Sequence, residues 1–222
     1  MTLQSINLRK LLKLMFLDER QLTSALRDDI REERAREHGV SSAGGDFYGP
    51  FWADAKAHVF GRSDLTDTTA ERIAVNNRRR NLYPRLRDGF LQWWNERRRW
   101  TNAPFTEIPV PTSQLKISGQ DVTVKVDCVL AVKDGVREDH YVYPYWFETP
   151  VISDESARVA LWFLTQALPQ IDPGEIRLLD VMRGQNFAIE RNPFQGNEAS
   201  IFSRRLERLV SARERLRGEY DF

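Results

Sequence analysis

Three strand-like runs follow one another after Pro104, and only short turns separate them. A Ser-Gly-Gln turn at 118–120 joins the first run to the second, and a Lys-Asp-Gly turn at 133–135 joins the second to the third. Turns this short join antiparallel strands, because a parallel pair needs a crossover of about a dozen residues or more. The chain is therefore expected to contain an antiparallel meander. The runs are FTEIPVPTSQLKIS at 105–118, QDVTVKVDCVLAV at 120–132 and REDHYVYPYWF at 137–147.

Helical patterns lie on both sides of this meander, since apolar residues recur there at a spacing of three to four. EIRLLDVMRG at 175–184 predicts a further strand, and QNFAIER at 185–191 predicts a return strand. The sequence thus predicts an α+β (mixed α/β) fold, with an N-terminal helical region at 1–81 packed on a core at 82–222 as one compact unit. The expected helices cover 8–38 in two pieces, 51–60, a stretch from a Thr68–Glu71 capping box towards Asn81, 84–100, 157–168 and 201–218.

Two helix starts carry N-cap residues. Asp18 precedes the second piece of 8–38 with Gln21 three residues on, and Ser153 precedes a helix with acidic residues in its first turn. The helix after Asp18 has a narrow apolar stripe of Leu22, Leu26 and Ile30. Two interpretations of this stripe remain open. It packs on the same chain, or it pairs with a second copy of the chain to form a homodimer.

Composition narrows the class of protein. Hydrophobic residues make up 41% of 222 residues, which is enough for a packed core, and the apolar runs are too short to span a bilayer. The single cysteine, Cys128, forms no internal disulfide and is expected to be a small buried residue. A soluble cytoplasmic protein without a membrane partner is the expectation. The histidines His38, His58 and His140 show no metal-ligand spacing.

Arginines gather between residues 78 and 99. The chain has 33 basic residues of which 6 are lysines, and this stretch holds eight arginines against Asp88 and Glu96. Guanidinium groups bind phosphates in a bidentate manner, so the cluster is a candidate contact for DNA or RNA, although charge runs are often only solvated faces. The candidate nucleic-acid-binding residues are Arg78, Arg79, Arg80, Arg97, Arg98 and Arg99.

From residue 82 the expected order is helix, three strands, helix, strand. This order, with an aspartate in the second strand (VKVDCVLAV), resembles the PD-(D/E)XK or restriction-endonuclease-like nuclease superfamily, and in particular its RecB-like members. The resemblance covers about residues 82–190. It implies a strand-two aspartate and a Glu/Asp-x-Lys on strand three that hold Mg²⁺ or Mn²⁺, with the lysine helping to activate water.

Carried over to this chain, the motif is incomplete. Asp127 stands at the position of the strand-two aspartate, but the third strand reads YVYPYWFETP and lacks the Glu/Asp-x-Lys. Two alignments stay open: either Pro144 and Trp146 replace the acid and the lysine, or Glu148 is the acid and Pro150 replaces the lysine.

A surviving active site would need substitutes for the lost residues. Its candidate catalytic residues are Lys125, Asp127 and Glu148, and its candidate metal ligands are Asp127, Glu148 and Glu96. Lys125 and Asp127 are two residues apart on a predicted strand and are therefore expected on one face.

Three hypotheses remain open. The first is a nuclease-fold protein with an eroded catalytic motif that acts as a nucleic-acid-binding or interaction module, without a required cofactor. The second is a structural or oligomeric protein with no nucleic-acid role. The third is a divergent metal-dependent nuclease, that is, a phosphodiesterase.

Overall fold

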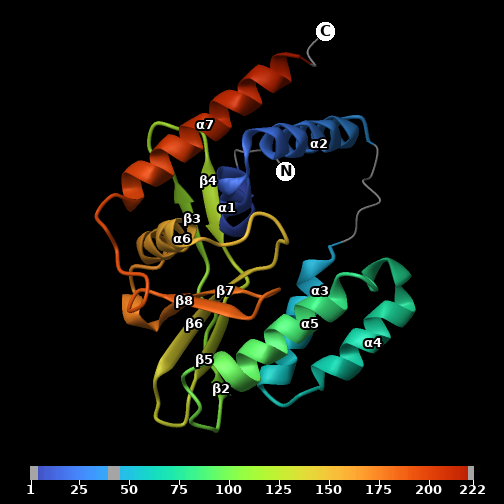
Figure 1. Cartoon of the computed structure of the whole chain (residues 1–222), viewed down its shortest axis with the longest axis vertical. Coiled ribbons are helices and arrows are strands. Elements are labelled where there is room, and N and C mark those ends of the chain that lie inside the picture. Colours follow the sequence, from blue (N-terminus) through green and yellow to red (C-terminus); the bar gives the residue numbers. More distant parts are fainter. Residues whose placement is uncertain (1–4, 40–45, 220–222) are drawn as a thin grey trace.

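The computed structural model describes residues 5–39 and 46–219, and it shows a mixed α+β fold (Figure 1). The helices are α1 (Leu8–Phe16), α2 (Glu19–Glu37), α3 (Tyr48–Val59), α4 (Leu65–Val75), α5 (Tyr83–Gln92), α6 (Asp154–Ala167) and α7 (Glu198–Gly218). Single turns of other helix types are η1 (Asn77–Arg79), η2 (Trp93–Arg97) and η3 (Pro173–Glu175). The strands are β1 (Ser5–Asn7), β2 (Thr106–Glu107), β3 (Ser113–Lys116), β4 (Thr123–Val126), β5 (Leu130–Lys133), β6 (Asp139–Tyr145), β7 (Ile176–Asp180) and β8 (Gln185–Ala188).

The strands form two sheets. The larger sheet has the order β2-β5-β6-β7-β8, in which β6 and β7 are parallel and are connected through α6. Its other pairs, β2–β5, β5–β6 and β7–β8, are antiparallel. The smaller sheet has the order β1-β4-β3, in which β1 runs parallel to β4 and β3 antiparallel to it.

The expected meander is present, but two of its three runs are divided. The first run forms β2 and β3 on either side of Pro109 and Pro111, whose missing N–H groups interrupt a ladder. The second run forms β4 in the smaller sheet and β5 in the larger sheet, with residues 127–129 between them. Both divided runs therefore pass from one sheet to the other, and the β3–β4 and β5–β6 pairings are antiparallel as predicted.

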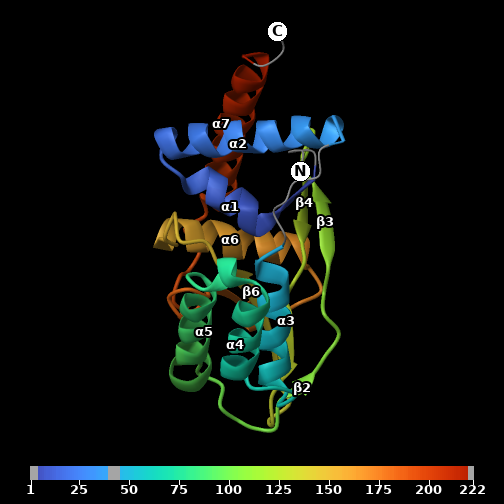
Figure 2. The same ribbon diagram turned by 90° about the vertical axis from the view of Figure 1, so that its right-hand side faces the viewer.

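Helices cover both faces of the larger sheet (Figures 1 and 2). Val142 and Trp146 belong to a core cluster with α3, α4 and α5, whereas Tyr143 and Tyr145 belong to a second cluster with α1, α6 and α7. Alternate side chains of β6 thus point to opposite faces, as the period of two in a strand requires. The helices of the N-terminal region divide between the two clusters, α1 and α2 in one, α3 and α4 in the other.

The apolar stripe of α2 is used within the chain. Leu22, Leu26 and Ile30 are buried together with residues of α1 and α7. At the next turn of α2, Glu33 forms a buried ion pair with Arg213 of α7. Of the two uses expected for this stripe, the structure shows packing on the same chain.

Most helix starts agree with the sequence analysis. Asp18 accepts a hydrogen bond from the Gln21 amide at 2.8 Å, and Ser153 forms a capping box with Ser156. The expected Thr68–Glu71 capping box is wrong, because α4 begins one turn earlier with Asp64 as its N-cap. In the described part of the chain, no helix combines the length and the apolar character that a membrane crossing needs.

Candidate functional site

Asp127 lies in the interruption between β4 and β5. The next residue, Cys128, has a φ of 62°, in the left-handed region that non-glycine residues seldom adopt. The indole N–H of Trp52 donates a hydrogen bond to the carbonyl of Cys128 and holds the chain in this turn. Cys128 is half-buried rather than fully buried, and this burial raises the pKa of its thiol, unlike that of an activated nucleophile.

Arg9, at the start of α1, neutralises Asp127. Its guanidinium group donates a hydrogen bond to Asp127 Oδ1 and stacks 4.7 Å from the ring centroid of Trp146. The Arg9 side chain is 11% exposed and that of Asp127 38% exposed. The Arg9 backbone amide also donates to Tyr143 Oη at 3.0 Å. Asp127 is therefore already engaged with a cation and lies beside aromatic side chains.

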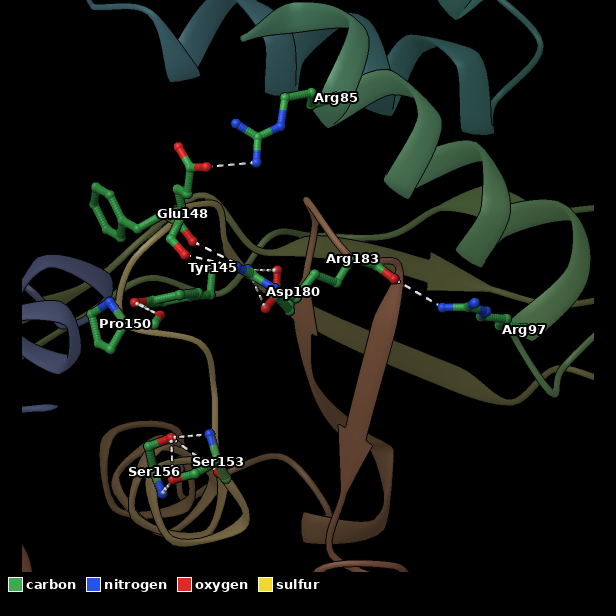
Figure 3. Close-up of polar contacts among 10 residues, drawn as sticks. Arg85, Arg97, Tyr145, Glu148, Pro150, Ser153, Ser156, Asp180 and Arg183 are labelled. Carbon is green, nitrogen blue, oxygen red and sulfur yellow. Dashed lines mark hydrogen bonds and ion pairs between the residues drawn. The ribbon is translucent and has the colours of Figure 1, made fainter.

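The other candidate catalytic residues lie elsewhere. Lys125 is paired in the smaller sheet between Asn7 of β1 and Gln114 of β3. Glu148 follows β6 and forms an ion pair with Arg85 of α5 at 2.8 Å, which lowers its pKa (Figure 3). Glu96 is in η2 and lines a separate hollow that also includes Arg85 and Met182.

The candidate metal ligands are not brought together. Among the described residues, the one group of three His, Cys, Asp or Glu side chains with mutually close ligand atoms consists of Asp134, Glu138 and His140. That group includes none of the three expected ligands. Trp146 contacts the cation that binds Asp127, whereas Glu148 is paired with Arg85 instead.

Asp180 and Arg183 form a structural pair at the end of β7. Asp180 is buried, and Arg183 Nη1 lies 2.9 Å from its Oδ2. Arg183 Nη2 donates to the Glu148 carbonyl at 2.6 Å and so ties the β7–β8 turn to the segment after β6 (Figure 3). Burial raises the pKa of Asp180, and the nearby guanidinium group offsets part of that effect.

The six candidate arginines divide into separate environments. Arg98 packs with its guanidinium carbon 3.5 Å from the ring centroid of Trp94, and burial lowers its pKa to about 10. Arg79 is half-buried and donates to the Arg72 carbonyl at 3.3 Å, while Arg78 and Arg80 are exposed at the start of α5. Arg97 and Arg99 are exposed at its other end. Arg98 is thus a packing residue, and the exposed ones form two distant groups.

Arg97 and Arg99 line a groove of about 440 Å³ over β8. Arg97 reaches it from η2, a π-helical turn in which the Arg98 amide donates to the Trp93 carbonyl at 2.8 Å. Its Nη1 donates to the Arg183 carbonyl at 2.8 Å and fixes the side chain over the β7–β8 turn (Figure 3). The remaining lining residues are Asp154, Gly184, Gln185, Asn186, Phe187, Arg191 and Asn192.

The groove is basic and rich in amide groups. It contains three arginines and one acid, Asp154, whose carboxylate accepts a hydrogen bond from Asn192 at 3.2 Å. Asn186 Oδ1 is buried and has no hydrogen-bond partner among the described residues. The sequence analysis missed the lining residues Gly184, Asn186, Phe187, Arg191 and Asn192, since a lone Arg191 far from the arginine cluster gives no signal without the fold.

No family model matches the chain, and comparisons with curated proteins and with solved structures find no significant similarity.

Proposed function

We propose that the protein is a nucleic-acid-binding module, built on a restriction-endonuclease-like core whose catalytic motif has eroded. The observation that carries the proposal is the groove over β8, in which Arg97, Arg99 and Arg191 converge from two segments of the chain. The order of elements from α5 to β7 supports the nuclease-like ancestry. Fold alone does not assign a function, so the groove has the greater weight.

Loss of catalysis is supported by the surroundings of Asp127. A magnesium ion needs several oxygen ligands and keeps several of its waters. Here Asp127 accepts a hydrogen bond from Arg9, and Trp146 packs on the same guanidinium group. Placing a metal at Asp127 would require displacing a cation that is itself 11% exposed. Such a site favours binding without cleavage.

Binding is supported by the chemistry of the groove. Guanidinium groups suit phosphate oxygens, and side-chain amides both donate to and accept from base edges and sugar hydroxyl groups. Three cations near one acid make the groove attractive to a polyanion.

The test is fluorescence anisotropy with labelled single-stranded DNA and RNA of mixed sequence, at low ionic strength and with EDTA present. The double variant Arg99→Glu/Arg191→Glu is expected to weaken binding by about tenfold or more, because two cationic contacts become repulsive. The matched control is Arg78→Glu/Arg80→Glu, which makes the same change of charge at the other end of α5.

The control variant is expected to bind nearly as the wild type does. Thermal melting of both variants checks that each one folds. Absence of binding by the wild-type protein contradicts the proposed function. Equal loss in both variants, or loss in the control alone, contradicts the assignment to the groove.

A further inference from the structure

The β5–β6 hairpin brings three metal-ligating side chains to one place. Lys133 of β5 pairs with Asp139 of β6, so Asp134 and Glu138 face each other where the strands enter the turn. Glu138 immediately precedes β6, and His140 is the second residue of that strand. One ligand atom from each of Asp134, Glu138 and His140 lies within 4.8 Å of the other two.

The two carboxylate oxygens of Asp134 make different contacts. Its side chain is fully buried, and Oδ1 accepts hydrogen bonds from the amides of Val136 and Glu138, each at 3.0 Å. Oδ1 is therefore committed to holding the turn. Oδ2 faces His140 Nε2 at 3.4 Å, which leaves this oxygen as the available ligand.

The spacing between these two atoms suits a bridging cation better than a hydrogen bond. A hydrogen bond between nitrogen and oxygen usually measures about 2.7–3.2 Å, so 3.4 Å is long. Zinc binds histidine nitrogen and carboxylate oxygen at about 2.0–2.2 Å, and two such ligands at a tetrahedral angle lie about 3.3–3.5 Å apart. The observed separation falls within that range.

Packing fixes the histidine in this position. The His140 side chain is 5% exposed, and its ring stacks on Trp100 with centroids 4.2 Å apart. Its Nδ1 atom has no hydrogen-bond partner among the described residues, so the polar contact of the ring is the long one to Asp134.

We propose that Asp134 Oδ2, a carboxylate oxygen of Glu138 and His140 Nε2 form a site for a divalent zinc ion, with water as the fourth ligand. Glu138 is exposed and turns its carboxylate inward to complete the site. The site lies apart from Asp127 and does not depend on the nucleic-acid-binding proposal. The turn of the same hairpin is linked to the arginine-bearing segment, because the Gly135 amide donates a hydrogen bond to the carbonyl of Asn102 at 2.6 Å. Asn102 is three residues after Arg99.

The experiment is isothermal titration of Zn²⁺ into the metal-free wild-type protein and three variants. The wild type is expected to bind one ion, and both Glu138→Gln and His140→Gln are expected to weaken binding by about tenfold or more, since each removes a direct ligand. Glu138→Gln is the decisive variant, because its exposed side chain is not needed for packing. Asp127→Asn is expected to bind as the wild type does.

A second readout follows the ligand set directly. Co²⁺ substituted at the site is expected to show the strong visible absorption of a four-coordinate ion in the wild type, and to lose it in Glu138→Gln. No binding of Zn²⁺ by the wild type at millimolar concentration overturns the proposal. Unchanged binding in Glu138→Gln overturns it as well, and so does loss of binding in Asp127→Asn alone.

Discussion

Arg9 and Asp127 form an unequal ion pair. The guanidinium group is 11% exposed and the carboxylate 38% exposed, so the cation depends more on its partner than the anion does. Removing one partner of a buried pair is costly because it leaves the other charge without compensation. This pair therefore contributes to stability as a packing element.

Asp127→Ala is expected to lower the free energy of unfolding by about 1–3 kcal/mol, below the range for fully buried pairs because Asp127 is partly solvated. The matched control is Asp28→Ala on α2, whose pair with Arg31 is 65% and 64% exposed and is worth about 0.5 kcal/mol or less. Urea denaturation measures both variants. Equal losses would show that the Arg9–Asp127 pair is an ordinary surface contact.

His140 gives the stability a pH dependence whose sign follows from its burial. Its pKa is lowered in the folded state, so as the pH falls below about 6.5 the unfolded chain takes up the proton first. As the pH is lowered from 7 to the folded-state pKa of His140, the free energy of unfolding is expected to decrease. The charged groups that act on the ring are Asp134, Arg177 and Glu138.

Metal-free protein in EDTA is the sample for this measurement. His140→Gln is expected to show a flatter stability profile over the same pH range, while His38→Gln, which alters an exposed histidine at the end of α2, keeps the wild-type profile. Parallel profiles for His140→Gln and the wild type would contradict the account of His140.

At the scale of elements, local chemistry made most boundaries predictable. Asp18 and Ser153 cap their helices as their side chains suggest, and Gly39, with a φ of 74°, follows the end of α2. The predicted start of α4 was wrong by one turn. Asp64 and Thr68 are both acceptable N-cap residues, and which of them caps the helix depends on the packing of Leu65. Local sequence does not contain that information.

The division of the second run could not be predicted from its residues. Apolar and polar residues alternate between Val122 and Val132 well enough to predict one strand. However, Cys128 adopts a left-handed backbone conformation, which is held by a hydrogen bond from Trp52, 76 residues earlier. The expectation that Lys125 and Asp127 share a strand face assumed that one strand contains both residues, whereas β4 ends at Val126. A contact between distant residues overrides the local pattern there.

Gly89 permits α5 to approach the β7–β8 turn at backbone distance. A Cβ atom at this position would lie 2.2 Å from the Val181 carbonyl oxygen and 2.6 Å from Met182. Gly89→Ala is therefore expected to lower the free energy of unfolding by about 2 kcal/mol or more. Gly218→Ala in α7, where a Cβ would have no neighbour within 4 Å, is expected to change it little or to raise it by up to about 1 kcal/mol.

Thermal unfolding of the two variants provides this comparison. If the Gly89→Ala protein were as stable as the Gly218→Ala protein, α5 and the β7–β8 turn would not be packed as closely as described. The same contact positions η2, and with it Arg97, over the β7–β8 turn.

At the scale of the whole molecule, two core clusters on opposite faces of one sheet hold segments far apart in the sequence. The α+β class was predictable from the order of patterns, but the parallel pairing of β1 with β4 was not, because three residues carry no strand pattern of their own. Nor could the sequence separate Arg98, which packs on Trp94, from its exposed neighbours. The groove exists only because the fold adds Arg191 to Arg97 and Arg99.

The central claim is that this groove binds nucleic acid through its arginines, and the salt dependence of binding tests it most directly. For single strands, the slope of log K against log salt concentration is about −0.7 for each phosphate neutralised. Arg99→Gln/Arg191→Gln is therefore expected to make the slope shallower by about 1.4, while Arg78→Gln/Arg80→Gln leaves it unchanged. An identical slope for the wild type and the groove variant would contradict the claim.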